Sequence, residues 1–252
     1  SFIFLGMFYF FNFKKFKITS QIFNFFFLIS ISGVVIPGTL FYIAASKVPA
    51  GILSLSVAFV PMLTYVSSLY LKIETFSLLR ISGVFLGFIA IFLLIGPPDS
   101  FADRSMVPWV LLAMICPICY TFENVFIDIK KPIEVNSITL ALGSSAITIL
   151  ILLPVVFYFE LFIDIKYPFQ KIEFSIIALG FITAVAYTLF IYLITNAGAV
   201  FASNVGYVVT ISGVIWGIVL FQETHSYWVW LSLITMIIGL SLVSPRRKTK
   251  KY

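Results

Sequence analysis

Long apolar runs, each ended by a short cluster of charged or small residues, set the pattern of the chain. A helix needs roughly 20 apolar residues to cross the hydrocarbon core of a bilayer. The run over 174–222 is long enough for two crossings, with Asn196-Ala197-Gly198 as the turn between them. The pattern predicts eight membrane-spanning helices, over residues 22–45, 50–71, 78–96, 107–128, 136–159, 174–195, 199–221 and 226–244.

The first eleven residues, SFIFLGMFYFF, are apolar but too short to span a bilayer. A signal peptide would carry basic residues before its apolar region, whereas here Lys14, Lys15 and Lys17 follow it. We therefore interpret residues 1–11 as half of a helix. A closed β-barrel is excluded because its strands would alternate polar and apolar residues. The predicted fold class is all-α: a polytopic membrane helix bundle of eight full helices and one partial N-terminal helix.

Composition and charge add an orientation to this picture. Of the 252 residues, 61% are hydrophobic and 10% are charged, whereas soluble proteins carry about 25% charged residues. Positively charged loops stay in the cytoplasm. One side of the predicted bundle holds 12 of the 16 Lys and Arg residues, namely Lys14, Lys15, Lys17, Lys72, Arg80, Lys130, Lys131, Arg246, Arg247, Lys248, Lys250 and Lys251. We expect a multi-pass protein of the cytoplasmic (inner) membrane with a cytoplasmic C-terminus, and the same rule explains the net charge of +6 without nucleic-acid binding.

A short polar phrase occurs twice, as IETFS at 73–77 and as QETHS at 222–226, at an offset of 149. At this offset the predicted helices 22–45, 50–71 and 78–96 map onto 174–195, 199–221 and 226–244, without a gap from 46 to 96. An odd number of crossings separates the two phrases, so the two copies have opposite orientations. Inverted five-helix repeats of this kind are typical of secondary transporters.

The offset also indicates a missing segment in the first copy. It places the counterpart of the helix at 136–159 over the half-helix 1–11, and the counterpart of 107–128 before the chain begins. We expect an N-terminally truncated chain, beginning with Ser1 in place of an initiator Met, whose intact form has ten helices. The predicted domains are a first repeat over 1–97, lacking its first helix and half of its second, an external linker over 98–106, and a second repeat with a basic tail over 107–252.

The duplicated phrase has a structural interpretation and a functional alternative. Thr75 and Ser77, and likewise Thr224 and Ser226, are candidate N-caps for the helices that follow them. Glu74 and Glu223 would lie beside a helix N-terminus, where the macrodipole favours an acid. We predict a structural role for both Glu residues in capping tight turns. Gating or ion pairing is the alternative.

Glu123, in ICYTFENVFIDIKK, is the one acid inside a predicted span. A carboxylate within a membrane is costly and is a candidate functional group by default. It could accept a proton or pair with a substrate amine. Alternatively, the helix ends earlier and Glu123 reaches the cytoplasmic headgroups. Cys116 and Cys119 flank a predicted kink at Pro117, where their spacing indicates packing rather than redox chemistry.

Other polar groups within the spans are less specific candidates. Pro61 and Pro117 are predicted structural kinks, of the kind that is tolerated where backbone lines a cavity. Aromatic and polar side chains inside a membrane either line a cavity or pack between helices. These candidates for substrate contact are Tyr120, Tyr65, Tyr187, Tyr207, Thr210, Asn204 and Trp216.

Several absences narrow the function. No Lys or Arg lies in the middle of a predicted span, and carriers of phosphorylated substrates need fixed positive groups. The single His225 lies in a predicted outer loop, so no metal site is expected. No nucleotide-binding motif occurs, so neither ATP nor another cofactor is expected.

The chain resembles the drug/metabolite transporter superfamily, and within it the EamA-type exporters. The likeness is carried by AASKVPAGILSLSVAFVPMLTYVSSLYLKIETFSLLRISGVFLGFIAIFLL and ITNAGAVFASNVGYVVTISGVIWGIVLFQETHSYWVWLSLITMIIGLSLV. In that family the fourth helix of each copy begins with small residues, carries a central Pro and ends in Glu. The first copy matches with Ala50-Gly51, Pro61 and Glu74. The second matches with Ala199 and Glu223, but has Thr210 where the Pro belongs. The resemblance implies export or exchange of small metabolites through a central cavity by alternating access.

Three functions are therefore compared. The first is a secondary exporter of a small neutral or cationic metabolite, such as an amino acid or amine, in which Glu123 supplies proton coupling or charge recognition. The second is an intramembrane enzyme, which would need a cluster of His, Asp or Arg at one depth. The third is a non-transporting membrane scaffold, which would need neither an inverted repeat nor a polar cavity. The sequence favours the transporter, and leaves the oligomeric state open between a monomer and a homodimer.

Overall fold

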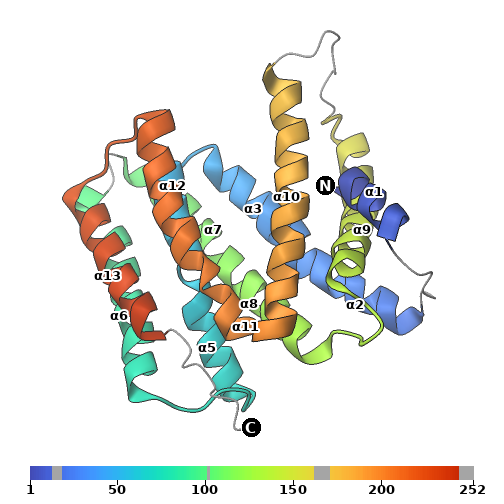
Figure 1. Cartoon of the computed structure of the whole chain (residues 1–252). Coiled ribbons are helices and arrows are strands. Elements are labelled where there is room, and N and C mark those ends of the chain that lie inside the picture. The colour runs from blue at the N-terminus through green and yellow to red at the C-terminus, as the bar shows by residue number, and fades with distance from the viewer. Residues whose placement is uncertain (13–18, 101–102, 162–170, 244–252) are drawn as a thin grey trace.

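The structure is a computed structural model that describes residues 1–12, 19–100, 103–161 and 171–243 (Figure 1). Over these residues the chain forms helices and turns, with no strand. The elements are α1 (Phe2–Asn12), α2 (Ser20–Ser30), η1 (Ile31–Val35), α3 (Ile36–Ala45), α4 (Ala50–Val57), α5 (Val60–Tyr70), α6 (Leu78–Ile95), η2 (Pro98–Ser100), η3 (Arg104–Met106), α7 (Val107–Ala113), α8 (Ile115–Lys130), α9 (Ser137–Tyr158), α10 (Lys171–Ala197), α11 (Ala199–Ser203), α12 (Val205–Phe221) and α13 (Tyr227–Val243).

All eight predicted spans are present in the described part of the chain, which confirms the polytopic helical bundle. Seven continuous helical stretches of 18 to 27 residues are long and apolar enough to cross a membrane. The eighth predicted span is α13, an apolar helix of 17 residues. The predicted half-helix at 1–11 corresponds to α1, which has 11 residues. Hydropathy alone therefore locates every helix, and its boundaries differ from the structure by only a few residues.

Several spans are interrupted, and prolines account for most of the breaks. Proline lacks an N–H group, and its ring clashes with the carbonyl of the residue four positions earlier. Helix α4 ends at Val57, four residues before Pro61. Helix α7 ends at Ala113, four residues before Pro117. Pro37 likewise follows η1, a turn of π-helix that joins α2 to α3. The break at Asn204, between α11 and α12, has no proline.

The two copies of the duplicated phrase lie at opposite ends of the bundle, as Figure 1 shows for the α5–α6 and α12–α13 loops. Helices α6 and α13, which follow the two phrases, pack side by side. Ser232 on α13 donates a hydrogen bond of 2.7 Å to the carbonyl of Ala90 on α6. The fold therefore agrees with an inverted arrangement in which corresponding helices run in opposite directions. The repeat boundaries at 97 and 107 stay a prediction.

Helices α6 and α13 approach each other closely because both carry glycine at the crossing. A Cβ atom on Gly239 would lie 2.8 Å from the carbonyl oxygen of Gly83, and one on Gly83 would meet the carbonyl oxygen of Gly239. Backbone atoms cannot move aside as a flexible side chain can. Close helix contact through small residues is the usual way in which membrane helices associate.

The substitution Gly83→Ala should therefore destabilise the bundle. We expect a loss of about 1–3 kcal/mol, the usual cost of overpacking, seen as a lower midpoint of thermal unfolding in detergent. Gly6→Ala is the control, because no atom lies within 4 Å of the Cβ that it adds. Equal midpoints for the two variants would contradict the close crossing.

Candidate functional site

A cavity of about 400 Å³ lies within the bundle and is lined from α1, η1, α3, α8, α9 and α10. Its polar lining is made of one carboxylate, three phenols and several hydroxyls. These residues are Glu123, Tyr120, Tyr187, Tyr42, Thr39, Ser145, Thr183 and Ser1. Among the residues described by the structure, no Lys, Arg or His side chain lines the cavity. The site is therefore suited to a small polar ligand that is neutral or carries a positive charge.

Glu123 projects from α8 and is 2% exposed. The hydroxyl of Tyr187, on α10, donates to its Oε1 atom at 2.5 Å. The Ser144 hydroxyl, on α9, lies 3.5 Å from the Tyr187 hydroxyl. A carboxylate held by a single phenol has remaining acceptor capacity. Glu123 can therefore bind a further donor from within the cavity.

The π-turn η1 makes room for the Glu123 carboxyl group. A Cβ atom on Gly33, in the middle of η1, would overlap the carboxyl atoms of Glu123. Turns of π-helix occur frequently at functional sites, because the extra residue in the turn changes which side chains face the neighbouring helix. Glycine at position 33 and the π-turn together allow the acid to lie against backbone.

The structure brings only some of the predicted site residues together. Glu123, Tyr120 and Tyr187 line the cavity. Tyr65 lies in the α5–α6 region, where its hydroxyl donates to the carbonyl of Thr75 at 3.1 Å. Four further candidates also lie outside the cavity: Tyr207, Thr210, Asn204 and Trp216. As substrate contacts, these four and Tyr65 stay predictions.

Sequence reasoning missed the contribution of η1 and α3. Gly33, Gly38, Thr39 and Tyr42 all line the cavity. Their small and polar side chains recur along one predicted span and could have indicated a polar face. Glycine and threonine are equally common at helix contacts in membranes, so the sequence alone did not separate lining from packing.

Two helices that begin inside the bundle have their first N–H groups bound by distant carboxylates. Glu223, after α12, accepts from the N–H groups of Ala50 at 2.6 Å and Gly51 at 3.0 Å, at the start of α4. Asp128, on α8, accepts from the N–H group of Ala199 at 3.0 Å, at the start of α11. Ala50 and Ala199 correspond at the offset of 149. The carboxylates satisfy N–H groups that have no partner within their own helices.

The predicted caps differ from this arrangement. Ser226 accepts from the N–H group of Val229 at 3.4 Å, consistent with an N-cap of α13. Ser77 makes no side-chain cap on α6, so that expectation is wrong. The Tyr65 hydroxyl instead organises this loop, since it also accepts from the N–H group of Ser77 at 3.1 Å. Glu74 forms an ion pair of 3.0 Å with Arg80, in the first turn of α6, and accepts a side-chain rather than a backbone hydrogen bond there.

The interface of α5, α8 and α11 contains buried polar side chains without hydrogen-bond partners. Asp128 on α8 binds the start of α11 at Ala199, and next to α11 a Cβ atom added to Gly206 on α12 would lie 3.4 Å from the ring of Pro61 on α5. Within the described residues, the unpartnered groups are Thr64 and Ser68 on α5, Thr121 and Asn124 on α8, and Asn204 at the α11–α12 break. A buried polar group without a partner costs about 1–3 kcal/mol, so this interface is less stable than an apolar one of equal size.

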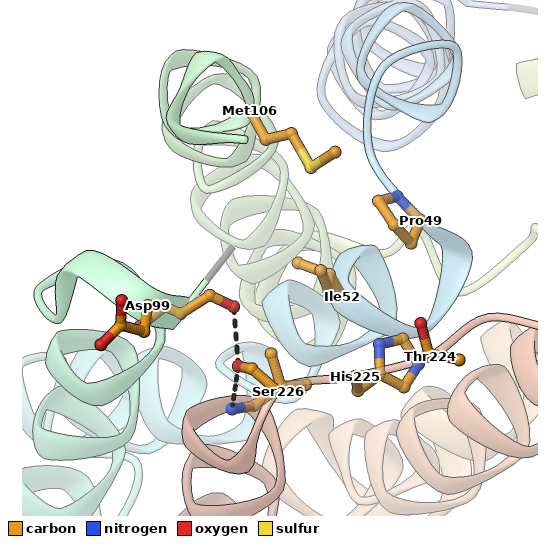
Figure 2. A pocket seen from close by; sticks show the side chains of 9 residues that line it. Pro49, Ile52, Asp99, Met106, Thr224, His225 and Ser226 are labelled. Atoms are coloured by element: carbon orange, nitrogen blue, oxygen red, sulfur yellow. Dashed lines mark hydrogen bonds between the residues drawn. The ribbon is translucent and has the colours of Figure 1, made fainter. Parts of the chain in front are cut away.

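A second cavity of about 480 Å³ lies beside the α12–α13 loop (Figure 2). It contains none of the predicted substrate contacts. Its lining includes Pro49 and Ile52 from the start of α4, and Thr224, His225 and Ser226 from the loop. Ser226 donates to the carbonyl of Ser100 at 2.8 Å, which ties the loop to η2.

The contact between Gly33 and Glu123 can be tested by a double-mutant cycle. Gly33→Ala should destabilise the native chain but cost less in a Glu123→Ala background, because the added methyl group then meets no carboxyl group. We expect a coupling of about 0.5–3 kcal/mol in thermal unfolding, as for residues in contact. Gly38→Ala adds a methyl group in the same cavity without a neighbour within 4 Å and should show no coupling. Additive effects for the Gly33 pair would contradict the geometry.

Comparison with known proteins agrees with this architecture. The sequence model of the EamA-like transporter family matches residues 107–244, which is more than half of the chain. The matched range lies within the second predicted repeat. A search of curated proteins finds no match. The bundle of apolar helices and the family match together identify the chain as a member of the EamA-like transporter family, within the drug/metabolite transporter superfamily.

Proposed function

We propose that this chain is a secondary transporter that exports or exchanges a small neutral or cationic metabolite, such as an amino acid or amine. The observation that carries the proposal is the position of Glu123, a buried carboxylate facing a cavity whose lining side chains include no base. An ammonium group entering the cavity would find the carboxylate and the phenols of Tyr120 and Tyr187. Glu123 is also the group that would accept a proton in a coupled mechanism.

Alternating access requires that the bundle open at one end and then at the other. At the end carrying Glu223, α4 and α12 are joined by reciprocal hydrogen bonds of 3.1 Å between the Ser54 and Thr210 hydroxyls and each other's carbonyls. At the other end, the α5–α8–α11 interface contains the unpartnered polar groups described above. We infer that these groups serve a second conformation, in which the interface opens and water or substrate satisfies them.

The proposed orientation follows from charge. Lys72, Arg80 and Lys130 lie near the end that carries Glu74 and Asp128, and basic loops stay in the cytoplasm. We therefore place the α5–α8–α11 interface on the cytoplasmic side of the cytoplasmic membrane. The α12–α13 loop and the cavity of Figure 2 then lie on the outer side.

Transport should depend on Glu123. A thermal-stabilisation screen with amino acids and amines first identifies a ligand, since a ligand that binds the folded state raises its unfolding midpoint. Uptake of that ligand into proteoliposomes is then compared between the unmodified chain and Glu123→Ala. We expect a decrease of about tenfold or more, the effect of losing one charge-assisted hydrogen bond.

Glu134→Ala is the matched control, because Glu134 is an exposed acid in the turn after α8. It should transport as the unmodified chain does. Normal transport by Glu123→Ala at every pH would remove Glu123 from the mechanism and leave the transporter assignment in place. A chain that binds and moves none of the compounds would contradict the proposed function itself.

A further inference from the structure

We propose that Glu223 and His225 form a clamp that holds the start of α4 closed against the α12–α13 loop, and that acid on this side releases it. The clamp is a positioning device. The role of the clamp as the outer gate of a transporter rests on the proposed function and orientation. Its opening can be measured without substrate.

The clamp is built around an unusual helix start. Pro49 precedes α4 and offers no side-chain cap, and Glu223 fills that role with both carboxylate oxygens at 2.6 and 3.0 Å from the N–H groups of Ala50 and Gly51. A carboxylate at this position interacts favourably with the partial positive charge of the helix N-terminus. Gly217, one turn before the end of α12, lets the carboxylate approach, since a Cβ there would overlap Oε2. Moving α4 away from α12 must break these contacts.

His225 is packed into the same contact. Its side chain is only 1% exposed, and Nε2 lies 3.4 Å from Oε2 of Glu223. Neither ring nitrogen has a hydrogen-bond partner. A Cβ atom on Gly51 would lie 2.7 Å from Nε2, so the imidazole rests directly on the first turn of α4. His225 also lines the cavity of Figure 2, beside Thr224, which gives protons a route to the ring.

The surroundings of the imidazole determine the direction in which the pKa of His225 is shifted. Burial lowers the pKa of His225, and the Glu223 carboxylate only partly opposes this. From η2, Asp99 lines the same cavity, although its side chain points away from the ring in Figure 2. The start of α4 presents a partial positive charge, and η3 contributes the apolar Met106. Arg104 donates instead to the carbonyls of Ile95 and Gly96.

The difference in the pKa of His225 between the open and closed clamp decides whether acid opens or closes it. In an open clamp the imidazole is solvated and titrates near its ordinary pKa of about 6.5. In the closed clamp its pKa is lower, so the closed state binds fewer protons. The contribution of neutral His225 to closure is therefore complete above about pH 6.5 and is lost as the pH falls through the lowered value. Acid shifts the population toward the open state.

The first copy of the phrase provides a built-in comparison. Phe76 stands at the position of His225, 149 residues earlier, and Glu74 is paired with the Arg80 side chain instead of the N–H groups that begin a distant helix. The proton-sensitive element therefore belongs to one end of the bundle. His225→Phe gives the second phrase the residue that the first already carries.

Cysteine accessibility tests the clamp. Ser54 is buried between α4 and α12, so Ser54→Cys should react with a membrane-impermeant thiol reagent only when the clamp opens. Ser46→Cys, at an exposed position before α4, corrects for the effect of pH on the reagent. Cys116 and Cys119 are replaced by Ala in all variants. We expect the ratio of the Ser54→Cys rate to the Ser46→Cys rate to rise several-fold between pH 7.5 and pH 5, in proteoliposomes without substrate.

In the His225→Phe variant the ratio should be the same at both pH values. The His225→Gln variant, with a neutral polar replacement, should give the same result. It serves as a second test in case the Phe variant misfolds. Glu223→Gln should raise the ratio at both pH values, because a neutral amide holds the start of α4 less firmly. A flat ratio in the unmodified clamp, or an equal rise in both His225 variants, would overturn the proposal. Failure of substrate uptake would leave this readout intact, so the two proposals fail separately.

Discussion

The absence of water from the bilayer core is the constraint on which this structure depends. Every backbone N–H and carbonyl group at that depth needs a partner within the protein, and the buried start of a helix at the end of a span likewise presents N–H groups that its own turns leave without one. The starts of α4 and α11 meet this need with the carboxylates of Glu223 and Asp128. Because Glu223 follows α12 and its partners begin α4, this interaction joins the two predicted halves of the bundle.

The helices could be predicted from sequence because hydropathy reports directly on the same constraint. A span must be long and apolar, so its presence is recorded in some twenty consecutive residues, and the breaks before Pro61 and Pro117 follow from the chemistry of proline. The partner of Glu223 could not be predicted in this way. It lies more than 170 residues away, and only the packing of α4 against α12 brings the two together.

The candidate site likewise has residues that the sequence predicts and contacts that only the packing of the helices creates. Glu123 was predicted because a lone acid within a span is conspicuous, and Tyr187 as one of several polar aromatic groups within the spans. The space for the Glu123 carboxyl group depends on Gly33, which lies in the π-turn η1. A π-turn adds one residue to a turn without altering the apolar pattern that predicts the helix. The face of η1 and α3 that lines the cavity of Glu123 could therefore not be identified from the apolar periodicity.

The two Glu residues of the duplicated phrase have different partners, and one of the differences between the copies lies at the position of Arg80. Arg80 lies six residues after Glu74 and binds it, with its guanidinium 5.1 Å from the centre of the Tyr65 ring. The position equivalent to Arg80 in the second copy is Val229, which is buried at 2% exposure. The second copy has no basic residue at this position, and Glu223 binds the N–H groups at the start of α4 instead. The inverted repeat thus supplies the same acid at both ends: Glu74 joins a loop to its own helix, and Glu223 joins one predicted half of the protein to the other.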